Sequence, residues 1–192
     1  MTEPTIVASA KTTEPSSWLV FTYRVPAEPA TKRVALWRRL KRMGAIYLQN
    51  GVCLLPRNDD NSRRLKMLEN DVGHMGGESL ILQTVALDHM QREKVIERFK
   101  ADRSEAYREL LDKCASFEDD IAKECQAGHF SYHALEKGDV ALKKLRSWFE
   151  KIKIFDFYAT PMGTQAEEGL RQCEAHLSCY AQRVFDAHSL GG

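Results

Sequence analysis

The chain has 192 residues, of which 43% are apolar and 29% charged, and its formal net charge is +1. This composition is that of an ordinary globular protein and excludes a globally disordered chain. No apolar run approaches the roughly 20 residues that a membrane-spanning helix needs, so we expect no membrane segment. Five cysteines at irregular spacing, without a secretion signal, indicate reduced thiols and a cytoplasmic protein. Residues 1–17 are rich in Thr, Ser and Pro and are expected to form a flexible tail.

A strand and a helix open the folded part of the chain. Residues 18–25, WLVFTYRV, concentrate aromatic and β-branched residues and predict a strand that is buried on both faces and closed by Pro26. Residues 32–43 predict a helix, with Thr31 as its N-cap and Gly44 just beyond its end.

A hairpin, a second helix and a further strand follow. Residues 45–49 and 52–55 are strand-like, and the Asn-Gly pair between them predicts a type I′ turn with positive φ at both residues. An apolar stripe predicts a helix over residues 62–75, and residues 78–87 alternate like a strand. The order βαββαβ predicts a ferredoxin-like α+β domain over residues 18–87.

Helices occupy the rest of the chain. Asp88 with Gln91 forms a predicted capping box that opens a long helix ending at Gly128. A second helix is expected over residues 139–155, and a third from the Thr164/Glu167 pair to about residue 188. The short connection between these two predicts an antiparallel helical hairpin. Residues 88–192 are therefore interpreted as a helical annex packed against the sheet domain.

The charge of the chain is unevenly distributed. Residues 18–87 carry 11 Lys or Arg against 6 Asp or Glu. At 100° per residue, Leu36, Leu40 and Met43 of the first helix cluster on one side with Trp37 on the flank, so these side chains should anchor the helix to the sheet. The helix has six cations and no anion: Lys32, Arg33, Arg38, Arg39, Lys41 and Arg42. A surface that contacts phosphate or another anion is one interpretation, and a merely solvated face is the other.

Two further basic features extend this hypothesis. Arg33 points closer to the apolar side, where it would either pair with a carboxylate at the rim of the core or coordinate an oxyanion. A second basic cluster lies around the second helix and consists of Arg57, Arg63, Arg64 and Lys66. Both helices of a ferredoxin-like domain cover the same face of the sheet, so the two clusters could form one positive surface.

Metal-binding and catalytic motifs are weak. One possible ligand set is Cys173, His176 and Cys179, which lacks a fourth ligand, and another is Cys125, His129 and His133. Gly128 interrupts the helix that would align the second set. We therefore expect no metal and no other cofactor. Any of the six His could meet one of the five Cys in space, but no motif marks a nucleophilic site, so an enzyme is the less favoured class.

Three segments carry a resemblance to a known family: VALWRRLKRMGAIYLQNGV at residues 34–52, RFKADRSEAYRELL from Arg98 and KLRSWFEKIKIFDFY from Lys144. The chain resembles the N-terminal domain of ChrB-type chromate-resistance proteins over nearly its whole length. The resemblance implies chromate-responsive gene regulation and association with DNA. It also implies similarity to the sheet domains of phenylacetate-type repressors and of small CRISPR-associated nucleases.

Two departures limit what the resemblance carries over. The CRISPR-type nucleases have a metal-binding Asp at the end of the first strand, where this chain has Tyr23 and Arg24, so nuclease activity is not expected. Family members commonly have a further C-terminal domain, so chromate sensing is not assigned to this chain.

The leading hypothesis is a non-enzymatic regulator of chromate resistance that contacts DNA. The expected contact residues are Arg33, Arg38, Arg39, Lys41, Arg42, Arg63 and Arg64. The alternatives are a module that binds chromate, sulfate or another oxyanion without DNA, or an enzyme that uses a thiol or a His. A homodimer is left open.

Overall fold

The computed structural model describes residues 15–189, so most of the expected N-terminal tail lies outside the described residues. The elements in chain order are β1 (Trp18–Arg24), α1 (Ala30–Lys41), β2 (Ile46–Gln49), β3 (Val52–Pro56), α2 (Asp59–His74), β4 (Glu78–Thr84), α3 (His89–Gln126), α4 (Tyr132–Lys153) and α5 (Pro161–Ser189).

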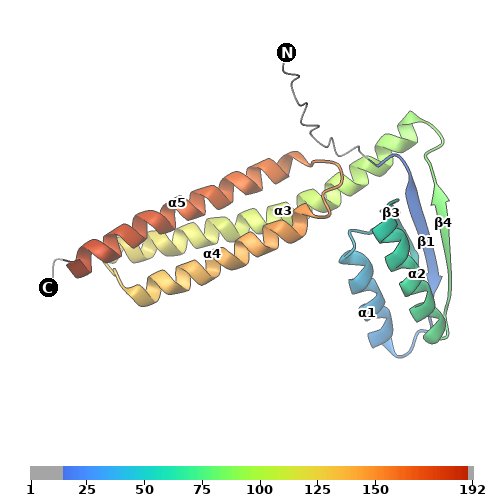
Figure 1. Ribbon diagram of the computed structural model, residues 1–192, viewed down its shortest axis with the longest axis horizontal. Helices are drawn as coiled ribbons and strands as arrows, with labels where there is room; N and C mark the ends of the chain where they lie inside the picture. The colour runs from blue at the N-terminus through green and yellow to red at the C-terminus, as the bar shows by residue number, and fades with distance from the viewer. Residues whose placement is uncertain (1–14, 190–192) are drawn as a thin grey trace, which may run out of the picture.

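The four strands form one sheet in the order β2-β3-β1-β4, and every neighbouring pair is antiparallel. Helices α1 and α2 lie on the same face of this sheet (Figure 1). Leu19 and Phe21 of β1 point to that face and join the core of α1 and α2, whereas Trp18 belongs to a cluster on the other face. The predicted ferredoxin-like α+β architecture is confirmed.

Helices α3, α4 and α5 run side by side and extend away from the sheet (Figure 1). They enclose a separate hydrophobic core. The predicted stripe of α5 is buried in this core and consists of Leu170, Cys173, Leu177, Tyr180 and Val184. Helix α3 is continuous over 38 residues and reaches from the sheet to the far end of the bundle.

A third hydrophobic cluster joins the sheet to the helices. Trp18 and Leu54 from the sheet pack there with Ile96 and Phe99 from the first turns of α3 and with Tyr158 from the loop before α5. The indole N–H of Trp18 donates a buried hydrogen bond of 2.8 Å to the Tyr158 hydroxyl. The two parts of the chain therefore share one packed junction. Across residues 15–189, none of the helices has the length and apolar character needed to cross a membrane.

The start of α1 differs from the prediction. Pro29 occupies the N-cap position, without a side-chain cap, and Thr31 lies inside the helix. Proline suits this boundary because its ring fixes φ and because it has no backbone N–H that would need a partner. Pro29 has a φ of −74° and a ψ of 140°, which is the extended conformation of a residue just before a helix. Trp37, expected to anchor the helix, is 47% exposed.

The hairpin forms as predicted, but its turn does not have the predicted type. Gly51 has a φ of +74°, whereas Asn50 is not among the residues with positive φ. A register shift between Tyr47 and Gln49 places an extra residue in β2. Because this bulge changes the twist at the end of the ladder, the turn needs only one left-handed residue.

Other element boundaries also shift. Helix α2 begins at Asp59 rather than residue 62, because the Asn58 side chain accepts the Asn61 backbone N–H at 2.7 Å. Ser131 similarly caps α4, which therefore begins at Tyr132 rather than residue 139. Helix α5 begins at Pro161, where a proline is well tolerated, so Thr164 is not its N-cap. Strand β4 ends at Thr84 rather than residue 87.

One predicted cap is confirmed. Asp88 precedes α3, and its carboxylate accepts the Gln91 backbone N–H at 2.8 Å. This bond fixes where the chain turns from β4 into the long helix.

Candidate nucleic-acid interface

Helix α1 separates an apolar side from a basic side. Leu36 and Leu40 are fully buried against the sheet. Arg38, Arg39 and Arg42 are exposed, and Lys41 is half-buried at the end of the helix. The four cations are thus held on the outside of the domain by the packing of the two leucines.

Two of these cations are engaged in ion pairs. Arg39 pairs with Asp71 of α2, which ties the two helices together. The ammonium of Lys41 lies 2.6 Å from a carboxylate oxygen of Asp102 on α3, and Arg103 contacts the other oxygen at 2.5 Å. Burial acts to raise the pKa of Asp102, but the hydrogen bonds and charges of Lys41 and Arg103 outweigh it and hold this pKa below its usual value.

The second predicted cluster is also partly neutralised. Arg63 and Arg64 lie in the first turns of α2, and both approach Asp60, at 3.5 Å and 2.8 Å. Lys66 approaches Glu69 at 3.8 Å. These pairs are exposed and contribute little to stability, but they reduce the positive charge that α2 presents.

Three of the predicted contact residues form no ion pair within the described residues. Arg33, Arg38 and Arg42 have no acidic partner among residues 15–189. Arg38 and Arg42 are one helical turn apart, so both project from the same side of α1. We expected the basic clusters of α1 and α2 to form one positive surface. Within the described residues, Arg38 and Arg42 are the cations of that surface without an acidic partner, and Arg39, at the border with α2, pairs with Asp71.

Arg33 lies apart from that pair. It is exposed, and it lines a hollow of about 440 Å³ together with Arg24 from the end of β1. Gly76, Gly77 and Glu78 form another wall of the hollow. Arg24 was not among the predicted contact residues, although its place at the end of β1, next to the turn into α1, could have suggested it.

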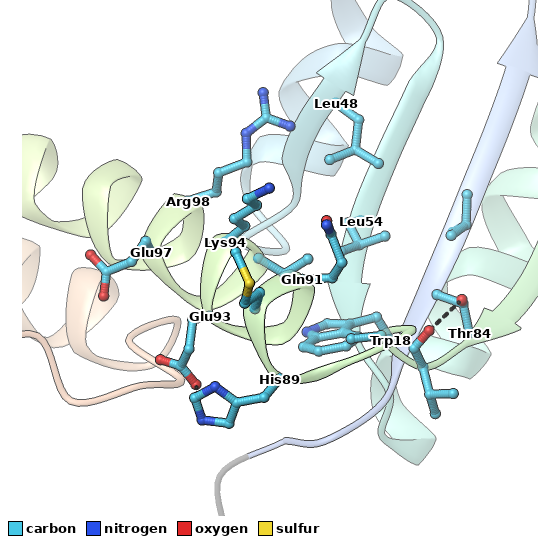
Figure 2. Close-up of a pocket in the computed structure, with 15 residues that line it drawn as sticks. Trp18, Leu48, Leu54, Thr84, His89, Gln91, Glu93, Lys94, Glu97 and Arg98 are labelled. Atoms are coloured by element: carbon cyan, nitrogen blue, oxygen red, sulfur yellow. Dashed lines mark hydrogen bonds and ion pairs between the residues drawn. The ribbon is translucent and has the colours of Figure 1, made fainter.

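A groove between the sheet and the long helix was also missed. It has a volume of about 960 Å³ and lies between the sheet face opposite α1 and the first turns of α3. Figure 2 shows Trp18, Leu54 and Leu48 on the sheet side, with Lys94 and Arg98 reaching from α3. The groove is mainly apolar, and Glu93, Lys94, Glu97 and Arg98 place charges of both signs at its edge. The sequence did hold an indication of this groove. Strand β1 is apolar on both faces, and α1 and α2 can cover only one of them.

The possible metal ligands do not form a site in the described part of the chain. Across residues 15–189, no three His, Cys, Asp or Glu side chains are placed to hold a metal ion. The Cys173 thiol is buried and lies 3.7 Å from a carboxylate oxygen of Glu118, which His176 approaches at 3.9 Å. Burial also raises the pKa of the Cys53 thiol to about 12, which leaves it unreactive near neutral pH.

Comparison with known proteins gives two findings. The family described as "Protein ChrB, N-terminal" matches residues 33–190. The chain is also similar to "Protein ChrB" of Cupriavidus metallidurans (strain ATCC 43123 / DSM 2839 / NBRC 102507 / CH34), with 30% identity over 101 residues. That similarity covers 53% of this chain and 31% of the relative, so the chain spans less than a third of the relative's length in the match.

Proposed function

Because the chain belongs to the family of ChrB N-terminal domains, we propose that it is a non-enzymatic regulatory module of chromate resistance that contacts DNA through α1. The observation that carries the proposal is the pair of exposed arginines, Arg38 and Arg42, which have no acidic partner among the described residues. Two guanidinium groups one turn apart on a rigid helix suit contact with the phosphates of a nucleic acid backbone.

The paired cations have a different part in this proposal. The ion pairs of Arg39 with Asp71 and of Lys41 with Asp102 bridge α1 to α2 and to α3, while the buried Leu36 and Leu40 hold the helix on the sheet. Since a fixed helix loses little conformational freedom on binding, this packing orients Arg38 and Arg42. Arg63 and Arg64 both pair with Asp60 on α2, which lies in the same layer of helices as α1. In this proposal they add weaker contacts to DNA.

The test is the affinity of the purified chain for duplex DNA, measured by fluorescence anisotropy at several salt concentrations. Each phosphate contact adds about 0.9 to the slope of log affinity against log salt, so losing two contacts lowers the slope by about 1.8. The double variant Arg38→Gln/Arg42→Gln is expected to show this loss. The matched control is Lys113→Gln/Lys144→Gln, which removes two exposed cations from the helical bundle. Salt-insensitive binding, or equal effects of the two double variants, would contradict the proposal.

A second candidate function is supported by the hollow that Arg24 and Arg33 line. Two guanidinium groups beside the small residues Gly76 and Gly77 suit a tetrahedral oxyanion such as chromate or sulfate, and they outnumber the one carboxylate of the hollow, Glu78. Calorimetry with chromate, sulfate and phosphate tests it. Heat that disappears in Arg24→Gln/Arg33→Gln but persists in Arg38→Gln/Arg42→Gln would support this site, and no heat with any of the three anions would end the idea.

A further inference from the structure

Strand β4 forms one border of the sheet. Within residues 15–189 it pairs with β1 alone, in a continuous register from Trp18 opposite Thr84 to Arg24 opposite Glu78. Its outer backbone groups have no backbone partner among the described residues. Border strands of soluble proteins are often protected by charged side chains, a proline, a bulge or short length. The seven residues of β4, ESLILQT, contain no proline and no bulge, and their one charged residue, Glu78, stands at the very start of the strand.

The exposed border continues into an apolar surface. Leu80 and Leu82 lie opposite Thr22 and Val20 of β1, and therefore point to the sheet face away from α1 and α2. They are 51% and 49% exposed. Past the end of the strand, Val85, Leu87 and Met90 are also exposed, and Val85 and Met90 line the groove that includes Val20. Single exposed leucines are normal, but a run of them beside an unprotected strand is typical of an interface.

The pattern of β4 is complementary to itself. If two β4 strands pair antiparallel over their full length, Ile81 of one copy lies opposite Ile81 of the other. Leu80 then lies opposite Leu82 on both sides of the two-fold axis, and the only charged residue, Glu78, lies opposite Thr84. No like charges meet, and the leucines form cross-strand pairs on one face. A shift by one residue would separate them onto opposite faces.

We propose that this protein forms a homodimer in which the β4 strands of two copies pair with each other. The two sheets then form one eight-stranded antiparallel sheet. The two-fold axis is perpendicular to the sheet, so α1 and α2 of both copies lie on the same side. This inference rests on the border strand and is independent of the proposed DNA contact.

Sedimentation velocity on the full chain tests the dimer from about 1 to about 100 µM. The wild-type chain is expected to approach twice its mass of 21.9 kDa as concentration rises. Leu82→Lys places two charges at the two-fold interface and is expected to weaken the dimer by about tenfold or more. The matched control is Leu48→Lys on β2 at the opposite border, where Leu48 is 37% exposed, and it should leave the dimer unchanged. Circular dichroism establishes that each variant is folded.

The register has its own test. In a Cys179→Ser background, a Leu80→Cys chain mixed with a Leu82→Cys chain should form a disulfide-linked dimer under mild oxidation, because the two positions face each other. A wild-type chain that remains monomeric at the highest concentration would overturn the proposal. A dimer that Leu82→Lys and Leu48→Lys affect equally, or that gives no link between positions 80 and 82, would also overturn it.

Discussion

Replacing Tyr158 with Phe removes the hydrogen bonds that its hydroxyl makes at the junction of the sheet and the helices. Tyr158 is 3% exposed, and its ring lies 5.4 Å from that of Phe99, a packing contact that phenylalanine can keep. The variant loses the hydroxyl that accepts the Trp18 indole N–H at 2.8 Å. It also loses the bond that this hydroxyl donates to the Pro15 carbonyl at 3.3 Å.

The expected cost follows from the burial of Trp18, which is 1% exposed. A buried donor left without its acceptor destabilises the folded state by about 1–3 kcal/mol. For a chain of this size, each kcal/mol lowers the melting temperature by about 2–4 °C, so a decrease of about 2–12 °C is expected.

Urea unfolding followed by far-UV circular dichroism measures the free energy of unfolding of both chains. The matched control is Tyr132→Phe, which makes the same chemical change on a side chain that is 51% exposed. The control should differ from the wild-type chain by less than about 0.5 kcal/mol. If Tyr158→Phe is as stable as Tyr132→Phe, the buried hydrogen bond does not stabilise the junction and the reasoning fails.

Three other outcomes are expected. Asp102→Asn should be less stable than the wild-type chain at neutral pH. The lowered pKa of Asp102 makes this difference complete above its ordinary value of 3.8, and the difference should shrink as the pH falls through the lower folded value, which unfolding across pH 2–7 measures. Gly51→Ala should destabilise the chain, since Gly51 has a φ of +74° and a Cβ would lie 2.5 Å from a backbone oxygen, whereas Gly73→Ala, in open space, should not. Alkylation followed by mass spectrometry should modify the exposed Cys179 before Cys53, whose pKa is about 12, and the reverse order would contradict the burial of Cys53.

The order of the elements could be predicted because local patterns and tertiary packing agree. The apolar stripe of α5 and the Asp88 cap of α3 appear at the expected residues. Boundaries that depend on competing caps were harder to predict. Asn58 and Ser131 start their helices earlier than the apolar periodicity suggested, because a side-chain cap can precede the first buried residue.

The sequence predicted which cations of the candidate site are exposed, but not which of them form ion pairs. Helical geometry placed Arg38 and Arg42 on the solvent side of α1, where the structure has them. The pairing of Arg39 with Asp71 and of Lys41 with Asp102 joins residues 32 and 61 positions apart, and sequence spacing holds no information about such contacts. Whether the exposed arginines bind DNA stays a prediction.

Helix α3 acts as a lever between the two ends of the molecule. At 1.5 Å per residue, its 38 residues span about 57 Å. The helix is uninterrupted between the part that packs near Trp18 and the part inside the bundle. A tilt of about 5° at the sheet end would therefore move the far end by about 5 Å. A small change where Lys41 holds Asp102 would thus be magnified mechanically at the opposite end of the protein.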